Sequence, residues 1–315
     1  MNCRLKSSRP KKTAVQLVRE MSLNKGVTFN NITRTQAVKF LQSRNNYFRI
    51  ISYKKNYKKI NGTYQKLDFS YLVELSKIDM YLRNLIIKAC IDIEHCLKVK
   101  ILHDIEYNNL ENGYDIVESF LSIPKKKYVI DEIRRASSSH YNGELIDHYF
   151  NYEITNGKLQ LDCPVWAFLE MISFGTLIDF YNFYYNKYNG FPIKANILNS
   201  VRSLRNACAH NNCIIHDLSP SQSTKSLYEI DYFVSKCNTI GKTSRRKKLK
   251  NQFILEFTSV LYVVDQLLPK DMKSLRKKEF KEFCNKRLIR EIDYFSDSLL
   301  IKSSIIFLKN LVDFF

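Results

Sequence analysis

The sequence predicts an all-α protein, and two observations support this fold class. The first is that only 8 glycines and 6 prolines occur in 315 residues, whereas sheet-rich proteins need these residues for their many tight turns. The second is that apolar residues recur at spacings of three and four along several segments. The 20 tyrosines and 20 phenylalanines favour strands weakly. With 45% hydrophobic residues, the chain is typical of globular proteins with one large or two medium domains.

The N-terminal part divides into a tail and a small helical unit. Residues 1–12 are rich in basic side chains, and we expect a flexible basic tail there. Residues 13–66 are expected to form an N-terminal helical unit, with helices over 13–24, capped by Thr13, and over 34–44.

Residues 47–66 interleave tyrosines with lysines, among them Lys54 and Lys55. Such a mixture can stack bases and hold phosphates. The alternative, which we favour, is a loop whose tyrosines pack on the core while the lysines face water.

The central segment, residues 67–270, is expected to form the main helical domain. From Asp68 to Asp104 the apolar residues form one continuous helical face, which predicts a long helix. Further helices are expected over residues 114–122, 128–136, 164–180, 193–214, 226–239 and 249–267. The polar residues 137–143 indicate a loop. Residues 271–315 are expected to be a C-terminal helical extension that ends in an apolar helix from Leu299.

The formal net charge is +19, and a surplus of this size attracts phosphate polymers. An AT-rich genome that drives lysine usage would explain the same composition, so charge alone leaves both readings open. The cationic candidates for weak contacts to an RNA backbone are Lys54, Lys55, Lys125, Lys126, Arg245, Arg246 and Lys247. Each run by itself is better explained as a solvated surface, but together with the charge they favour an RNA partner.

Cysteine usage and hydropathy indicate a cytoplasmic protein. None of the 8 cysteines forms a C-x-x-C pair, and the N-terminus has no apolar signal segment. No run of about 18 uncharged apolar residues occurs, so no membrane span is expected. The sequence also has no Gly-rich phosphate loop and no acidic or histidine-rich metal motif. We therefore expect free thiols, no metal and no cofactor.

The strongest chemical motif is Arg205-Asn206-Ala207-Cys208-Ala209-His210. On a helix, Asn206 and His210 share a face because they are four residues apart, and the long side chain of Arg205 can reach the same place. RNA cleavage without a metal needs proton transfer to and from the reacting oxygens and stabilisation of charge on the phosphate. A histidine and an arginine supply these functions. A polar patch on this otherwise apolar helix suits a cleft lined by helices.

The motif alone has limited specificity, since a chain with 6 histidines is expected to contain about one chance match. Arg135 followed by His140 is such a match, but it continues into a serine-rich loop and lacks an asparagine after the arginine. The alternative reading of Arg205 and His210 themselves is two side chains that pack in helix contacts.

Three segments together resemble the Abi-like family of bacterial abortive-infection proteins, of the AbiD/AbiF type. They are Ile78-Asp79-Met80-Tyr81-Leu82-Arg83 with Ile93-Glu94, Pro164-Val165-Trp166 with Ser173-Phe174-Gly175, and Val201-Arg202-Ser203-Leu204-Arg205-Asn206-Ala207-Cys208-Ala209-His210. The N-terminal Tyr47-Phe48-Arg49 with Tyr53 also fits the family. The order and spacing of these segments match over roughly residues 13–270, which is more specific than any one motif. The family is counted with the HEPN superfamily, whose members are all-α, often dimeric, and typically metal-independent RNases.

The resemblance implies a multi-helix HEPN-like bundle in which Arg205, Asn206 and His210 are catalytic. His210 would transfer protons, Arg205 would clamp the phosphate, and Asn206 would orient or bind it. One signature per chain implies a homodimer in which two copies complete one site. Glu94 would either orient the motif or form an ordinary salt bridge.

The function implied is a metal-independent endoribonuclease that acts as a toxin in phage defence and cuts by 2′-OH transesterification. The alternative is an RNA-binding module that clasps a small noncoding RNA without cleavage. Among the remaining residues, we expect Asp79 and Arg83 to form a structural pair. For His216 we favour a position that ends the motif helix over one that faces the cleft. For Trp166 and Phe174 we favour the core over a role as base-stacking platforms.

Overall fold

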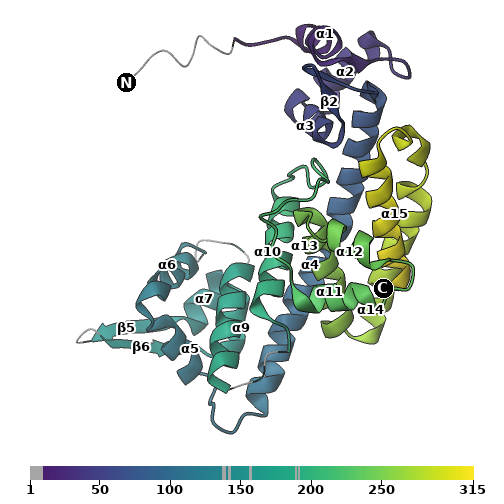
Figure 1. Cartoon of the computed structure of the whole chain (residues 1–315). Helices are drawn as coiled ribbons and strands as arrows, with labels where there is room; N and C mark the ends of the chain where they lie inside the picture. Colours follow the sequence, from purple (N-terminus) through teal and green to yellow (C-terminus); the bar gives the residue numbers. More distant parts are fainter. Residues whose placement is uncertain (1–9, 137–139, 141–142, 156–157, 189, 191) are drawn as a thin grey trace. The chain divides into compact units, whose positions relative to one another are not determined.

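The computed structural model describes residues 10–136, 140, 143–155, 158–188, 190 and 192–315 (Figure 1). In these residues, fifteen α-helices accompany three sheets of two short strands each, so the all-α prediction is confirmed. Most of the loop expected over residues 137–143 lies outside the described residues.

The chain divides into two compact units. The first unit comprises Met1–Ile87, Leu204–Leu261 and Ser274–Phe315, and the second comprises Lys88–Ser203 and Tyr262–Lys273. Neither unit is one continuous stretch of sequence. The four segments expected from the sequence stay a prediction.

The N-terminal elements of the first unit are short. They are α1 (Ala14–Lys25), β1 (Val27–Thr28), α2 (Arg34–Ser43), α3 (Tyr47–Ser52), a 3₁₀ turn (Tyr53–Asn56), β2 (Lys59–Ile60), β3 (Thr63–Tyr64) and β4 (Leu67–Asp68). Thr13 caps α1 and exchanges hydrogen bonds with Gln16, as a capping box. The first two predicted helices are thereby confirmed. The strands β1 and β4 pair in parallel, and β2 and β3 form an antiparallel hairpin.

The tyrosine- and lysine-rich segment is more ordered than a loop, because it holds α3, a 3₁₀ turn and the β2–β3 hairpin. The side-chain pattern that we favoured is confirmed. Tyr53 and Tyr57 are buried, while Lys55, Lys58 and Lys59 are exposed.

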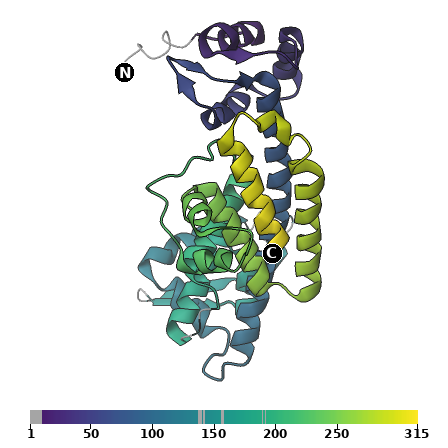
Figure 2. The ribbon, with the colours of Figure 1, turned by 45° about the vertical axis from the view of Figure 1, so that its right-hand side comes forward.

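The long helix α4 (Phe69–Glu106) is confirmed and runs without a break. The other helices that contribute to the first unit are α10 (Ala195–Ala209), α11 (Tyr228–Ser235), α12 (Lys242–Lys248), α13 (Gln252–Leu267), α14 (Lys270–Phe283) and α15 (Leu299–Phe314). Between the last two lie a π-helical turn (Cys284–Leu288) and a 3₁₀ turn (Ile292–Phe295). The C-terminal segments lie beside the first half of α4 (Figures 1 and 2). Tyr71 contacts the ring of Tyr294, and Glu74 forms an ion pair of 2.8 Å with Arg287.

The second unit packs helices around an aromatic core. Its own elements are α5 (Asp115–Leu121), a 3₁₀ turn (Pro124–Lys126), α6 (Lys127–Ala136), α7 (Gly143–Tyr149), β5 (Asn151–Thr155), β6 (Lys158–Asp162), α8 (Val165–Met171) and α9 (Phe174–Tyr188). The rings of Phe120, Phe168 and Phe180 contact one another edge to face and are fully buried.

The predicted bounds of two helices are wrong. The helix expected over residues 164–180 is two helices, because Ile172 is extended and the Ser173 hydroxyl caps the start of α9. Pro164 is the N-cap of α8 rather than a residue of its first turn. The helix expected over residues 193–214 ends at Ala209.

Candidate active site

The C-terminal end of α10 and the next residue, His210, carry the Arg-Asn-x-x-x-His motif. Leu204 and Cys208 are buried and attach the helix to the core of the first unit. The other side of the helix is open, since Asn206 and His210 are exposed and Arg205 is half-buried. The Arg205 guanidinium donates a hydrogen bond of 3.3 Å to the Asn206 side-chain oxygen. The motif therefore forms a polar face at the surface of one chain, rather than the lining of a closed cleft.

The helix ends directly after the motif, in a Schellman turn. The Asn212 N–H donates to the Ala207 carbonyl at 2.8 Å, and the Asn211 N–H donates to the Cys208 carbonyl at 3.0 Å. Asn211 has a φ of 57°, the left-handed conformation that this turn requires. The His210 N–H keeps its helical bond to the Asn206 carbonyl at 2.9 Å. The turn thus fixes the backbone of His210.

A side chain from the N-terminal elements of the first unit holds this turn. Arg49, on α3, donates to the backbone carbonyl of Asn211 and, at 3.2 Å, to its side-chain oxygen. A guanidinium fork that bonds two oxygens of one residue fixes its orientation more strictly than a single bond would. The residue that follows His210 is therefore held by α3.

A buried ion pair on α4 holds the next residues of the loop. Arg83 forms an ion pair with Asp79 and donates to the Asn212 carbonyl at 3.1 Å. Asp79 also accepts a hydrogen bond of 2.9 Å from the Ile215 N–H. The expectation of a structural pair is confirmed, and the pair also supports the loop after the motif.

Asn56 fastens the far end of the same loop. Its amide group donates to the carbonyls of Ile215 and His216 at 3.0 and 3.2 Å, and its oxygen accepts from the Leu218 N–H at 2.8 Å. Asn56 is only 4% exposed, so these bonds are shielded from water. The expectation that His216 ends the motif helix is wrong. This residue lies in the loop, where its Nδ1 is 2.7 Å from the Cys213 carbonyl.

Burial shifts the pKa values of several groups near the loop. Desolvation lowers the pKa of Arg83 and raises the pKa of the Cys208 thiol to about 12. Burial also raises the pKa of the Tyr53 hydroxyl. Cys208 is therefore a thiol at neutral pH and serves as a packing residue. The catalytic roles of Arg205, Asn206 and His210 stay a prediction.

A family comparison matches this part of the chain. The model of a family described as Abi-like protein matches residues 39–216, which is more than half of the 315 residues. The chain belongs to the Abi-like protein family. The match includes Arg49, the Asp79–Arg83 pair and the motif, and it is shorter than the span of residues 13–270 over which we expected a resemblance. Searches of curated proteins and of solved structures gave no match.

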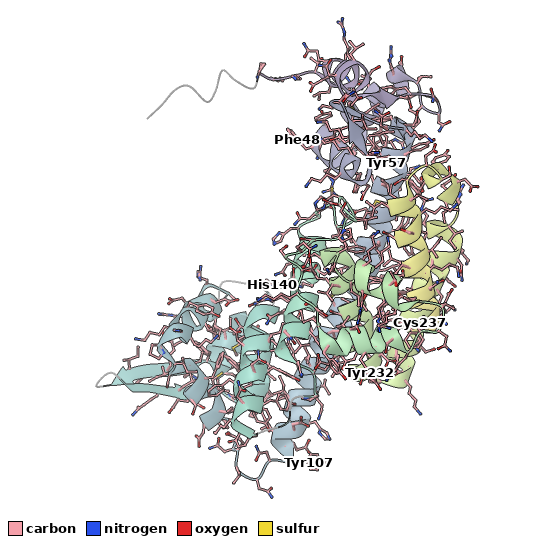
Figure 3. All side chains as sticks on the ribbon, in the orientation of Figure 1. Phe48, Tyr57, Tyr107, His140, Tyr232 and Cys237 are labelled. Atoms are coloured by element: carbon pink, nitrogen blue, oxygen red, sulfur yellow. The ribbon has the colours of Figure 1, made fainter. Side chains whose placement is uncertain are left out.

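Two side chains of the Abi-like protein to which the sequence assigned no role support the loop after the motif. Arg49 and Asn56 lie more than 150 residues before the loop that they bind. Their only sequence signal is a position inside a segment that resembles the family. Phe48, next to Arg49, is 81% exposed (Figure 3).

Glu94, a predicted supporting residue of the site in this Abi-like protein, lies in the second unit, as do Trp166 and Phe174, which were expected in the core. Glu94 is half-buried on α4 within the second unit, and its support of the motif stays a prediction. Trp166 is 49% exposed and packs edge to face against Tyr114, so its placement in the core was wrong. Phe174 is 2% exposed, as expected for a core residue.

Several of the predicted RNA-binding cations have partners within the protein. Lys126 forms an ion pair with Asp179, and Arg245 forms one of 3.0 Å with Asp231. Lys54 is half-buried, and desolvation lowers its pKa. The cations with exposed side chains are Lys55, Lys125, Arg246 and Lys247. These four remain the better candidates for contacts to a phosphate backbone.

The described residues contain neither a cluster suited to a metal ion nor a helix suited to span a membrane. No three His, Cys, Asp or Glu side chains gather there in an arrangement that would hold a metal ion. In the same part of the chain, no helix combines the length and the apolar character needed to cross a membrane.

Proposed function

We propose that this Abi-like protein is a metal-independent endoribonuclease of the HEPN type that acts in abortive infection. The observation that carries the proposal is the polar face at the end of α10. Asn206 and His210 are exposed on it, and Arg205 is bonded to Asn206. Hydrogen bonds from Arg49 to Asn211 and from Arg83 to Asn212 hold the two residues that follow His210. A surface built in this way presents a proton-transfer group and a phosphate-binding group in a set geometry.

The chemistry follows from the residue types. The 2′-OH loses its proton to a histidine and attacks the adjacent phosphorus. The bond from phosphorus to the 5′-oxygen then breaks, and that oxygen gains a proton. The guanidinium of Arg205 stabilises the extra negative charge on the phosphate, and Asn206 holds the guanidinium or a phosphate oxygen. The products are a 2′,3′-cyclic phosphate and a 5′-hydroxyl end, and the step needs no metal.

Two proton transfers favour two histidines, and one chain supplies one such motif. A second copy of the chain would bring a second His210 and complete the site. The exposure of Asn206 and His210 supports this proposal because the face is open to a partner. The surplus of positive charge, +19, favours RNA as the substrate.

The test is an RNA cleavage assay in EDTA that compares the wild type with His210→Ala. We expect the variant to lose activity by about 10²- to 10⁴-fold, the usual contribution of a general acid or base. His140→Ala is the matched control, because His140 is exposed and follows Arg135 in the chance match. Full activity of His210→Ala, or an absolute need for a divalent metal, would overturn the proposal.

A dilution series tests the dimer. If two chains form one site, activity per chain should fall when the protein is diluted below the dissociation constant of the dimer. Activity per chain that stays constant while sedimentation shows a monomer would contradict the composite site. A tightly bound RNA that the wild type never cleaves would instead favour the alternative role of an RNA-binding module.

A further inference from the structure

Two tyrosines on the exposed side of α11 and a lysine at its C-cap follow one another at intervals of four residues. Tyr228 and Tyr232 are 76% and 54% exposed. Their ring centroids are 6.3 Å apart, and the ring planes differ by only 6°. The Lys236 ammonium lies 4.6 Å from the centroid of the Tyr232 ring. We call these three residues the aromatic row (Tyr232 is labelled in Figure 3).

The aromatic row is not needed for the core of the first unit. The opposite side of α11 supplies Ile230, Phe233 and Val234, all of which are buried. Large exposed aromatic side chains with parallel faces leave apolar surface in contact with water. The exposed apolar surface of the two rings is therefore accessible to a ligand.

A cationic helix, α12, packs beside α11. Arg245 of α12 bonds Asp231 of α11 at 3.0 Å, which connects the two helices next to Tyr232. Lys242, Arg246 and Lys247 of α12 are exposed. Residues 225–250 hold 8 Lys and Arg and 2 Asp and Glu, a net charge of 8 − 2 = +6. Both acidic residues are half-buried, so the exposed charge on this surface is positive.

We infer that the aromatic row and the exposed cations of α12 form a binding surface for single-stranded RNA. Every base offers an aromatic face, so tyrosine rings bind bases by stacking without regard to sequence. Lysine and arginine neutralise the phosphates along the strand. Stacking requires bases that are not already stacked in a duplex, and this selects single strands and loops. The inference rests on the proposed function, since this surface would hold the RNA that the motif cuts.

The test measures binding separately from cleavage. The probe is a short fluorescent oligonucleotide with 2′-O-methyl groups, which lacks the attacking hydroxyl, and the readout is fluorescence anisotropy with the full-length protein. Tyr228→Ala/Tyr232→Ala should weaken binding by roughly tenfold or more, as expected when two rings that stack on bases are removed. Tyr228→Phe/Tyr232→Phe should bind like the wild type, because the ring stacks and the hydroxyl does not.

Controls separate stacking from charge and from general damage. Tyr107→Ala removes a tyrosine that is 72% exposed in the second unit and should leave binding unchanged. Log affinity falls with log salt, and in Arg246→Ala/Lys247→Ala this fall should be less steep by about 0.7 for each phosphate that the variant no longer neutralises. The tyrosine variant should keep the wild-type slope.

Three outcomes would overturn the inference. They are a change smaller than about twofold in the alanine double variant, equal loss in the phenylalanine variant, and binding of duplex RNA or an acidic peptide as tight as that of the single strand. None of these depends on whether His210 is catalytic. Failure of the cleavage test with intact binding would therefore refute the proposed function and leave this surface in place.

Discussion

Arg83 and Lys248 are two cations of the first unit that are equally buried, at 6% exposed, and the protein treats them in opposite ways. Arg83 is paired with Asp79 and with the carbonyl of Asn212. Lys248 bonds the hydroxyls of Ser303 and Ser304 at 2.7 Å. Among the described residues, no carboxylate is paired with it.

The pKa values show the same contrast. Burial lowers the pKa of both groups, and it lowers that of Lys248 to about 8. A buried charge without a counter-charge carries a large desolvation cost, whereas a paired one is partly compensated. The pair therefore occurs where the geometry of the motif loop depends on it. The uncompensated lysine packs against the C-terminal helix α15. Replacing it there by an uncharged side chain should increase the free energy of unfolding.

The largest effect is expected from breaking the pair. Asp79→Ala should lower the free energy of unfolding by about 3–5 kcal/mol, because it leaves Arg83 buried without its partner. Urea denaturation at neutral pH measures this loss. Asp297→Ala is the matched control. Asp297 pairs with Lys66 at the surface, and its loss should cost less than about 1 kcal/mol. Similar losses of unfolding free energy in the two variants would show that the buried pair stabilises the protein no more than the exposed one.

Replacing Lys248 should change the free energy of unfolding by a smaller amount and in the opposite direction, as a stabilisation. The folded pKa of about 8 lies below the ordinary lysine value of 10.5, so between these pH values the unfolded chain binds more protons. The wild type should therefore gain stability as the pH rises through this window, and below it the full cost of the charge remains. Lys248→Met should be more stable than the wild type by roughly 1–3 kcal/mol at neutral pH.

The pH dependence of that difference is the sharper measurement. Other groups also titrate at high pH, but they do so in both proteins and cancel in the difference between them. The advantage of Lys248→Met should shrink steadily above pH ~8. An advantage that does not change with pH, or a variant that is less stable at neutral pH, would contradict the account of an uncompensated charge.

The smallest effect is expected at Arg49, which bonds Asn211 of the turn from the neighbouring helix α3. Arg49→Ala should reduce the proposed RNA cleavage by about tenfold, or about 1.4 kcal/mol in the barrier, because the turn after His210 is then less rigid. The unfolding transition should change little, since Arg49 is half-buried. Arg44→Ala, a change at an exposed arginine at the end of α2, is the control. Equal activity in both variants would show that the turn needs no help from α3.

Elements with a local signal were predictable from the sequence. The spacing of apolar residues identified α4 over nearly its whole length, and the capping residue Thr13 identified the start of α1. The Asp79–Arg83 pair was predictable because its members are four residues apart on a helix. The motif was found for the same reason, since its residues are close together in the sequence of one helix.

Features that depend on distant residues were missed. The sequence from 193 to 214 is compatible with a helix throughout, but Asn211 turns left-handed where Arg49 binds it, 162 residues away. The break between α8 and α9 depends on one extended residue, Ile172, in a segment that also suits a helix. Trp166 was misplaced because hydrophobic character gives the expected burial of a tryptophan and not the side of the helix on which it falls.

The left-handed turn at Asn211 also limits which substitutions the family can accept there. Alanine and larger apolar residues are disfavoured by the positive φ of 57°. Glycine suits the backbone but loses the side-chain oxygen that Arg49 binds. Asparagine and aspartate satisfy both demands. Relatives with a glycine at this position should therefore be free to vary at the position of Arg49, and relatives with asparagine or aspartate should retain arginine there.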